Sequence, residues 1–360
     1  MVAGPLERDR FEDLATESSW PPPAGTTQMD TPLGLMIRRW CAPLLDLEPY
    51  TPVEDYLARR IALGAVDVNR RFLRAAGLER LLLDTGYRSA DILGPAEMSA
   101  AAGVPAHEVV RLEAVAEANL AAGGEAKAYP RAYEERLALA ARDAVGLKTI
   151  IAYRGGFDFD HRPPSEASVV AAAGRALRRP TERLVDRTLL RHSLWAGIRL
   201  ARERGIPIQV HVGYGDSDLT LHLTNPSLLT PLIRSTAGTG VNLVLLHCYP
   251  YHREAAYLAA VYPHVYLDVG LAINYTGPSS SAIIGETMEL APFSKVLYSS
   301  DAFGLAELFY LGALLFRRGL AATLDSWIGS DNCSAEEAER IAGLVATGNA
   351  MRIYPLSGSD

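Results

Sequence analysis

Three short apolar runs in the second half of the chain each end in a polar side chain. The runs cover residues 207–211, 241–247 and 295–301, and their last residues are His211, His247 and Asp301. Apolar runs of this length between turn residues are typical of buried parallel strands. Because the strand ends on one face of a parallel α/β barrel point toward one site, the pattern predicts that these three side chains share a site.

The same alternation extends back through the chain. Four further strands are predicted at 81–86, 108–113, 147–153 and 265–270, with helices between them that include 133–145 and 182–204. The run 108–113 is ambiguous, because a helix continuing to Ala121 has a similar pattern, but the spacing of the units favours a strand. Seven strands alternating with helices predict an α/β fold, with a TIM (β/α)8-type barrel as first choice. An open doubly wound sheet is the alternative, and no Gly-x-Gly-x-x-Gly turn supports it.

The first 80 residues have a different pattern. Residues 1–20 are mostly polar, residues 21–25 form a proline-rich loop, and short helices are predicted after that. We therefore divide a single overall domain into 1–80, loop and helices packing on the barrel, and 81–360, the barrel. No apolar run supplies an eighth strand, so the barrel is expected to lack its first strand and to show a gap between the Leu81 and Asp301 strands. We expect upstream codons of a longer reading frame to encode that strand.

Composition narrows the class of protein. With 360 residues, 49% of them hydrophobic, the chain can bury a large core. Its net charge of -7 argues against nucleic acid or an anionic membrane as the partner. The three cysteines are scattered and form neither a zinc knuckle nor a disulfide framework, so a cytoplasmic location is expected. No apolar run approaches ~20 residues, so no membrane span is expected.

The residues around the three strand ends resemble a known superfamily. His211 in Gln-Val-His-Val-Gly, His247 in Leu-Leu-His-Cys-Tyr-Pro and Asp301 in Tyr-Ser-Ser-Asp are similar to the fifth-, sixth- and eighth-strand motifs of the amidohydrolase superfamily. The end of the chain, 348–354, resembles the family's closing helix. The likeness is greatest to the amidohydrolase-related (family 2) branch, in particular the metal-dependent hydrolase domain found fused to glutamine-synthetase-like domains.

This resemblance implies one or two divalent metal ions, with zinc expected, at the top of the barrel. It implies that His211 is a metal ligand and that Asp301 is a ligand that also takes the proton from a metal-activated water. His247 would bind a second metal or polarise the substrate carbonyl. Neutral imidazole and carboxylate ligands suit zinc, and bound water then ionises near a pKa of roughly 7.

Two other ligand positions of the family differ in this sequence. The family's first strand ends in His-x-His, and none of the 8 histidines here has that spacing. Some relatives carry a carbamylated lysine at the end of the fourth strand. Lys148 lies in the corresponding strand but near its start, so we expect it to face the bottom of the barrel. A lysine-bridged pair of metals is therefore disfavoured.

Substrate contacts are expected from side chains that follow the strand ends. The candidates are Arg154, Glu113, Tyr249, His252 and Tyr214. Arg154 precedes two glycines and could hold a substrate carboxylate in a bidentate manner, or it could form an ion pair with Glu113. Tyr214 lies in a glycine-rich acidic loop, which suits a lid or a pocket wall.

The favoured function is a metal-dependent hydrolase acting on an amide-type carbon–nitrogen bond of a small molecule, with a γ-glutamyl bond implied by the resemblance alone. A metal-dependent decarboxylase of the same superfamily is one alternative. A catalytically inactive barrel is the other, because the His-x-His ligands are absent. A homo-oligomer and a glutamine-synthetase-like partner are also compatible with the resemblance.

Overall fold

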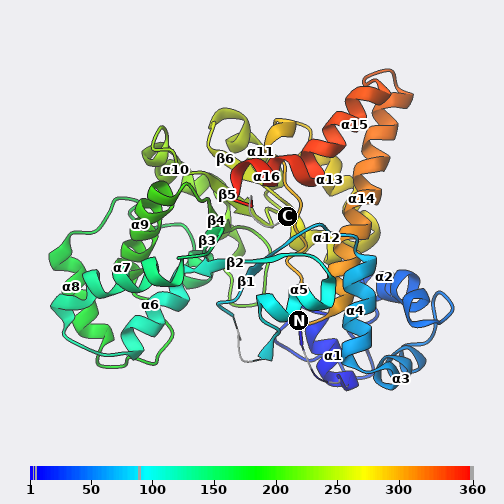
Figure 1. Cartoon of the computed structure of the whole chain (residues 1–360), viewed down its shortest axis with the longest axis horizontal. Coiled ribbons are helices and arrows are strands. Elements are labelled where there is room, and N and C mark those ends of the chain that lie inside the picture. Colours follow the sequence, from blue (N-terminus) through cyan, green and yellow to red (C-terminus); the bar gives the residue numbers. More distant parts are fainter. Residues whose placement is uncertain (3, 5, 88–90, 357–360) are drawn as a thin grey trace.

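A sheet of six parallel strands forms the centre of the molecule (Figure 1). The computed structural model describes all residues except 3, 5, 88–90 and 357–360. The strands follow one another in the sheet in chain order: β1 (Leu81–Asp84), β2 (Ala106–Arg111), β3 (Gly146–Thr149), β4 (Ile208–His211), β5 (Leu243–Leu246) and β6 (Val265–Leu267). Parallel neighbours joined by helical crossovers define a TIM-type barrel, as the sequence predicted, with a helical segment before the first strand.

The strands are short, and β3, β5 and β6 are wholly buried, whereas β1 and β2 at the edge of the sheet are only partly buried. β5 and β6 are apolar throughout because they are covered on both faces, whereas the equally buried β3 carries Lys148 and Thr149. His211 of β4 pairs with Leu246, the last residue of β5. This register brings the ends of the two strands to the same level of the sheet.

The sheet is open between its first and last members. β1 pairs with β2, and the predicted strand at 295–301 forms only one parallel bridge, from Val296 to Leu267 of β6. A cavity of about 1180 Å³ lies between these two edges and is lined by both, including Leu81, Leu83 and Leu297. Among the described residues, the predicted gap between the Leu81 and Asp301 strands is therefore present.

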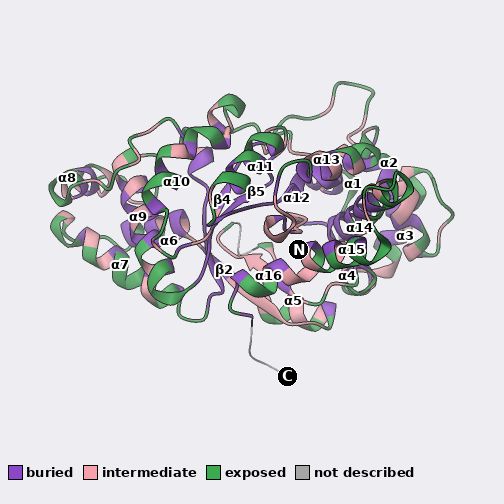
Figure 2. Cartoon of the chain, turned by 90° about the horizontal axis from the view of Figure 1, so that it is seen from above, coloured by how far each residue is buried: buried purple, intermediate pink, exposed green. Residues whose placement is uncertain are grey.

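Helices surround the sheet and expose their outer faces, whereas the strands from β3 to β6 are mostly buried (Figure 2). They are α5 (Pro95–Ala102), α6 (Leu112–Ala121), α7 (Tyr129–Ala140), α8 (Glu166–Ala176), α9 (Arg187–Arg204), α10 (Thr230–Thr236), α11 (His252–Val261), α12 (Gly270–Thr276), α13 (Ser280–Thr287), α14 (Ala306–Gly329), α15 (Ala335–Gly343) and α16 (Asn349–Ile353). Both interpretations of 108–113 hold in part, because β2 ends at Arg111 and α6 begins at the next residue. No helix of the described chain is long and apolar enough to cross a membrane.

The N-terminal segment packs on the long helix α14. It contains α1 (Arg8–Leu14), α2 (Pro32–Met36), α3 (Val53–Leu63) and α4 (Ala65–Ala75), and α4 contacts α14 directly. The Glu307 carboxylate in the first turn of α14 accepts hydrogen bonds from Arg60 Nε at 2.8 Å and from the Tyr56 hydroxyl at 3.0 Å. All three side chains are buried, so they tie α3 to the barrel. The division at residue 80 remains a prediction.

Candidate metal centre

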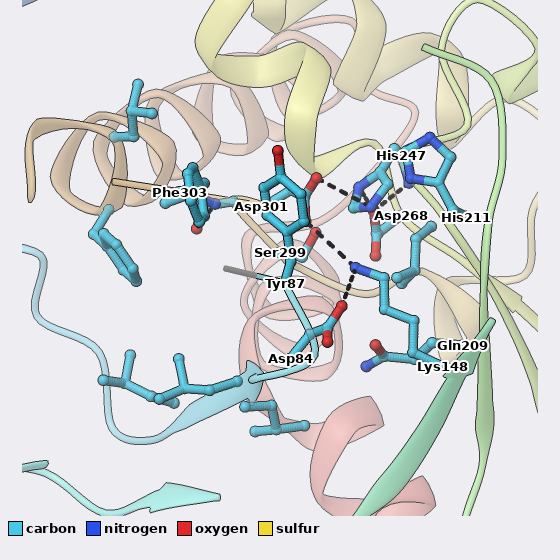
Figure 3. Close-up of a pocket in the computed structure, with 18 of the residues that line it drawn as sticks. Asp84, Tyr87, Lys148, Gln209, His211, His247, Asp268, Ser299, Asp301 and Phe303 are labelled. Carbon is cyan, nitrogen blue, oxygen red and sulfur yellow. Dashed lines mark hydrogen bonds and ion pairs between the residues drawn. The ribbon is translucent and has the colours of Figure 1, made fainter. Parts of the chain in front are cut away.

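Three potential metal ligands meet at the carboxyl ends of the strands. His211 ends β4, His247 follows β5, and Asp301 follows the segment bridged to β6. One ligand atom from each lies within 4.8 Å of the others, and both histidines are buried. Figure 3 shows Asp301 facing the two imidazoles across the cavity. Side chains that are 36 and 54 residues apart in the chain are thus placed in one site by the strand register.

The backbone turns sharply at two of these residues. His247 and Asp301 have φ angles of 68° and 45°, in the left-handed region that non-glycine residues rarely adopt. Asp268 supports the first turn, because its Oδ1 accepts hydrogen bonds from the amides of His247 at 2.8 Å and Gly270 at 3.0 Å. Such backbone strain persists only where surrounding contacts fix it, and it gathers at functional sites.

The surroundings of His211 and His247 favour the neutral form of both imidazoles. Burial, and then the repulsion that a protonated His247 would exert, lower the pKa of His211 well below its usual value, while burial and the Lys148 cation do the same for the pKa of His247. The 3.3 Å approach of His247 Nε2 to Asp301 Oδ2 is therefore not an ion pair. His211 Nε2 and both ring nitrogens of His247 are buried without a hydrogen-bond partner in the described structure. Unpartnered imidazole nitrogens beside a carboxylate suit a divalent cation.

Lys148 lies at this cluster, so the expectation that it faces the bottom of the barrel is wrong. Its Nζ is 3.3 Å from Asp84 Oδ2 and 3.7 Å from Asp301 Oδ1 (Figure 3). The reason is that β3 is short and ends at Thr149, only one residue later. Lys148 pairs with Gln209, two residues before His211, so it shares the inward face with that histidine.

Asp84 is the anchor of a buried group of charges on the other side of Lys148. Arg111 Nη2 lies 2.5 Å from Asp84 Oδ2. Burial alone would raise the pKa of Asp84, but the Lys148 and Arg111 cations outweigh it and hold the pKa below its usual value. Asp84 was not among the expected site residues, although it is the last residue of β1 and so occupies the same kind of strand-end position as His211.

Of the five expected substrate contacts, only Arg154 lines the cavity. It ends a short 3₁₀ turn, Ile151–Arg154, and not the strand itself. Its Nη2 lies 3.1 Å from Glu117 Oε1, so the expected ion-pair partner Glu113 is incorrect. Arg154 Nε is buried without a partner, which leaves one donor of the guanidinium available.

The other four candidates do not line this cavity, and their roles as substrate contacts remain predictions. Glu113 is buried and accepts hydrogen bonds from Thr149 Oγ1 at 2.6 Å and the amide of Ile150 at 3.1 Å. His252 Nε2 is 2.8 Å from Glu286 Oε2, which points it toward α13. Tyr249 stacks on the His252 ring, and the Tyr214 ring packs against Tyr275.

The arrangement is that of an α/β barrel with a candidate metal centre at the strand ends. Comparison with known proteins gives the family, because the amidohydrolase family model matches residues 66–356. The chain therefore belongs to the amidohydrolase family and is an enzyme of the metal-dependent hydrolase type, as the strand-end motifs indicated.

Individual relatives agree with this assignment. The chain is 32% identical over 232 residues to protein FluG of Emericella nidulans, covering 61% of this chain and 26% of that protein, so it spans about a quarter of the length of that relative. The crystal structure of a protein described as a metal-dependent hydrolase, from Lactobacillus casei ATCC 334, aligns with a TM-score of 0.86 at 27% identity, covering 98% of this chain and 92% of that one. Uronate isomerase from Thermotoga maritima shares the fold, with a TM-score of 0.64 at 12% identity over 98% and 89% of the two chains.

Proposed function

We propose that this protein hydrolyses an amide-type carbon–nitrogen bond of a small molecule with the help of a bound zinc ion. The observation that carries the proposal is the convergence of His211, His247 and Asp301 within 4.8 Å. Three protein ligands of nitrogen and oxygen type, with one position open to water, are typical of catalytic zinc sites. When bound, the metal supplies Lewis acidity, which lowers the pKa of a water toward neutrality and polarises a carbonyl.

The chain's own residues provide the proton transfers. Asp301 is the carboxylate nearest to the imidazoles, so it accepts a proton from the attacking water and passes it to the departing amine nitrogen. Hydrolysis then balances, because the hydroxyl goes to the carbonyl carbon and the proton goes to the leaving group. Lys148, held by Asp84, orients Asp301 Oδ1 from the other side. Asp268 fixes the backbone at His247.

Within amides, we propose a γ-glutamyl or similar carboxylate-bearing substrate. Two features support it: the similarity to FluG and to domains fused to glutamine-synthetase-like partners, and the available donor of Arg154 on the cavity wall. A guanidinium can hold a carboxylate through parallel hydrogen bonds.

Product analysis tests this function. Zinc-loaded protein is incubated with a panel of γ-glutamyl amides and simple amides, and released amine, ammonia and carbon dioxide are measured. Stoichiometric amine or ammonia release that falls by about 100-fold or more in Asp301→Asn is the expected result. Carbon dioxide release in its place identifies a decarboxylase. No release of amine or ammonia from any amide, at full metal occupancy, would overturn the proposal.

A further inference from the structure

Two aromatic side chains, Tyr87 and Phe303, form part of the wall of the cavity that contains the metal centre. Tyr87 lies in the loop after β1, and Phe303 lies two residues after Asp301. Their ring centroids are 5.1 Å apart with an interplanar angle of 56°, so the loops at the two edges of the open sheet meet through these rings. In Figure 3, Phe303 and the two imidazoles lie on opposite sides of Asp301.

The backbone holds both rings in place. Gly86 passes so close to β2 that a methyl group in its place would lie 2.5 Å from Arg111 Cβ. This approach brings the next side chain, Tyr87, over the Arg111 guanidinium, whose Cζ is 5.5 Å from the ring centroid. Gly304 follows the second ring with a φ of 74°, and a methyl group there would lie 2.6 Å from Leu14 Cδ2. Because glycine fits both positions and larger residues do not, the wall is built to present these two rings.

The contacts of Tyr87 within the protein leave much of its ring uncovered. Its exposed fraction is 45%, even with Phe303 and Arg111 beside it. Small-molecule sites are lined mainly by apolar and aromatic side chains, with a few polar groups that fix the orientation of the ligand. A ligand that covers a half-exposed ring in such a site gains from the apolar area that it removes from water. The Tyr87 ring is therefore available to the apolar part of a substrate.

The reaction relates this wall to the amine part of the substrate. In the proposed hydrolysis Asp301 passes a proton to the departing nitrogen, so this nitrogen lies within hydrogen-bond reach of the carboxylate. The carbonyl carbon lies on the imidazole side, where His247 Nε2 is 3.3 Å from Asp301 Oδ2. The substituent on the nitrogen then extends past Asp301 toward Phe303 and Tyr87. Arg154 follows β3 instead, and its position suits the acyl part.

We propose that Tyr87 and Phe303 are specificity-determining residues that select an amide whose amine part carries an aromatic ring. The proposal rests on the proposed amide hydrolysis, because that reaction sets which end of the substrate faces these rings. An aromatic group is favoured over an aliphatic group of the same size, since tilted and offset pairs of rings are more stable than their buried area alone accounts for. The chemistry is unchanged: the carbon–nitrogen bond breaks, and the amine leaves with the proton from Asp301.

The test compares γ-glutamyl benzylamide with γ-glutamyl cyclohexylmethylamide on the zinc-loaded protein. Both release a primary alkyl amine of nearly the same size, and they differ in whether the ring is aromatic. The preference is the ratio of kcat/KM where hydrolysis occurs, and the ratio of dissociation constants from titration calorimetry where it does not. The benzyl compound should be preferred about 2- to 12-fold, the range expected for one aromatic pair. The corresponding pair of acetamides should show the same preference, which makes the result independent of the acyl group.

Variants assign the preference to the two rings. Tyr87→Leu and Phe303→Leu, which keep an apolar side chain without the ring, should each reduce it, and the double variant should abolish it. Tyr87→Phe should retain it, because the ring and not the hydroxyl makes the contact. Tyr257→Leu is the matched control, since Tyr257 is a 55% exposed tyrosine of α11 that does not line the cavity. This variant should also retain the full preference.

The outcomes separate this inference from the proposed function. The inference is overturned if neither pair of amides shows a preference, or if the preference persists in the double variant. It is also overturned if the double variant loses zinc, which would make the rings structural supports of the metal centre. Hydrolysis without a preference would leave the proposed function standing alone. A preference that the double variant abolishes, in protein that hydrolyses none of the compounds, would leave the aromatic contact standing and remove the proposed function.

Discussion

The buried ion pair between Arg60 and Glu307 should hold the N-terminal segment against the barrel. Their exposed side-chain fractions are 3% and 0%, and the Arg60 Nε to Glu307 Oε1 distance is 2.8 Å. Glu307 also accepts a hydrogen bond from Tyr56. Glu307→Leu therefore leaves one buried cation and one buried hydroxyl without their partner. Because an uncompensated buried charge is strongly destabilising, the loss in unfolding free energy should be about 3–5 kcal/mol.

Urea unfolding followed by circular dichroism measures this loss. The double variant Arg60→Met/Glu307→Leu removes both charges, so it should be more stable than Glu307→Leu alone, with a coupling free energy of at least about 2 kcal/mol. Glu135→Leu, which breaks the exposed pair with Arg131, is the matched control and should leave the unfolding midpoint unchanged. A loss below about 1 kcal/mol for Glu307→Leu, or a double variant no more stable than the single one, would refute the reasoning.

Two further predictions concern the cavity wall. Arg154→Lys should raise KM for a carboxylate-bearing amide by more than for a neutral amide of the same size, because lysine cannot form the planar bidentate contact; equal effects on both would indicate that Arg154 only supports Glu117. The metal-free protein should also be most stable at low pH with respect to Glu17, a residue of the N-terminal segment that lines the cavity: its pKa rises from 4.5 to about 7 on folding, so this contribution is complete below pH 4.5 and is lost as the pH rises through 7. Glu17→Gln should therefore reduce the change in unfolding free energy between those pH values by on the order of 2 kcal/mol, and identical pH profiles would contradict the burial of this carboxyl.

The sequence predicted those features that depend on local pattern. Buried strands appear in the sequence as apolar runs. The sequence pattern alone therefore located the ends of β4 and β5, with His211 and His247. The segment ending at Asp301 was predicted as a strand, but among the described residues it forms only one parallel bridge, from Val296 to Leu267. A hydrophobic pattern indicates that a run is buried, and it does not report how many partners pair with it.

Features that depend on exact strand length were harder to predict. Lys148 was placed at the bottom of the barrel because the apolar run seemed to continue to Tyr153. The strand in fact ends at Thr149, and Ile151–Arg154 form a 3₁₀ turn. Because the strand ends this early, the Lys148 ammonium lies 3.7 Å from Asp301 Oδ1 and not at the bottom of the barrel.

Glu17 could not have been placed from sequence at all. It lies in a polar stretch without periodicity, and its neighbours in space, Tyr275 and Asp216, are about 200 residues or more away in the chain. The tertiary contact between Ser19 and Ser217 fixes this segment, and no local signal encodes such a contact. For the same reason, the sequence did not indicate the contact of His252 with Glu286, and its role in substrate binding remains a prediction.

The most direct test of the central claim is the zinc content and zinc affinity of the purified protein and of single ligand variants. Elemental analysis after dialysis against zinc should give at least one ion per chain, and titration calorimetry should show a large loss of affinity in His211→Ala, His247→Ala and Asp301→Ala. His264→Ala is the matched control, because His264 is a buried histidine that contacts the Thr236 hydroxyl, 3.1 Å from its Nε2, and does not line the cavity. Zinc affinity should be unchanged in that variant. Equal zinc binding by the native protein and all three ligand variants would contradict the metal centre proposed for His211, His247 and Asp301.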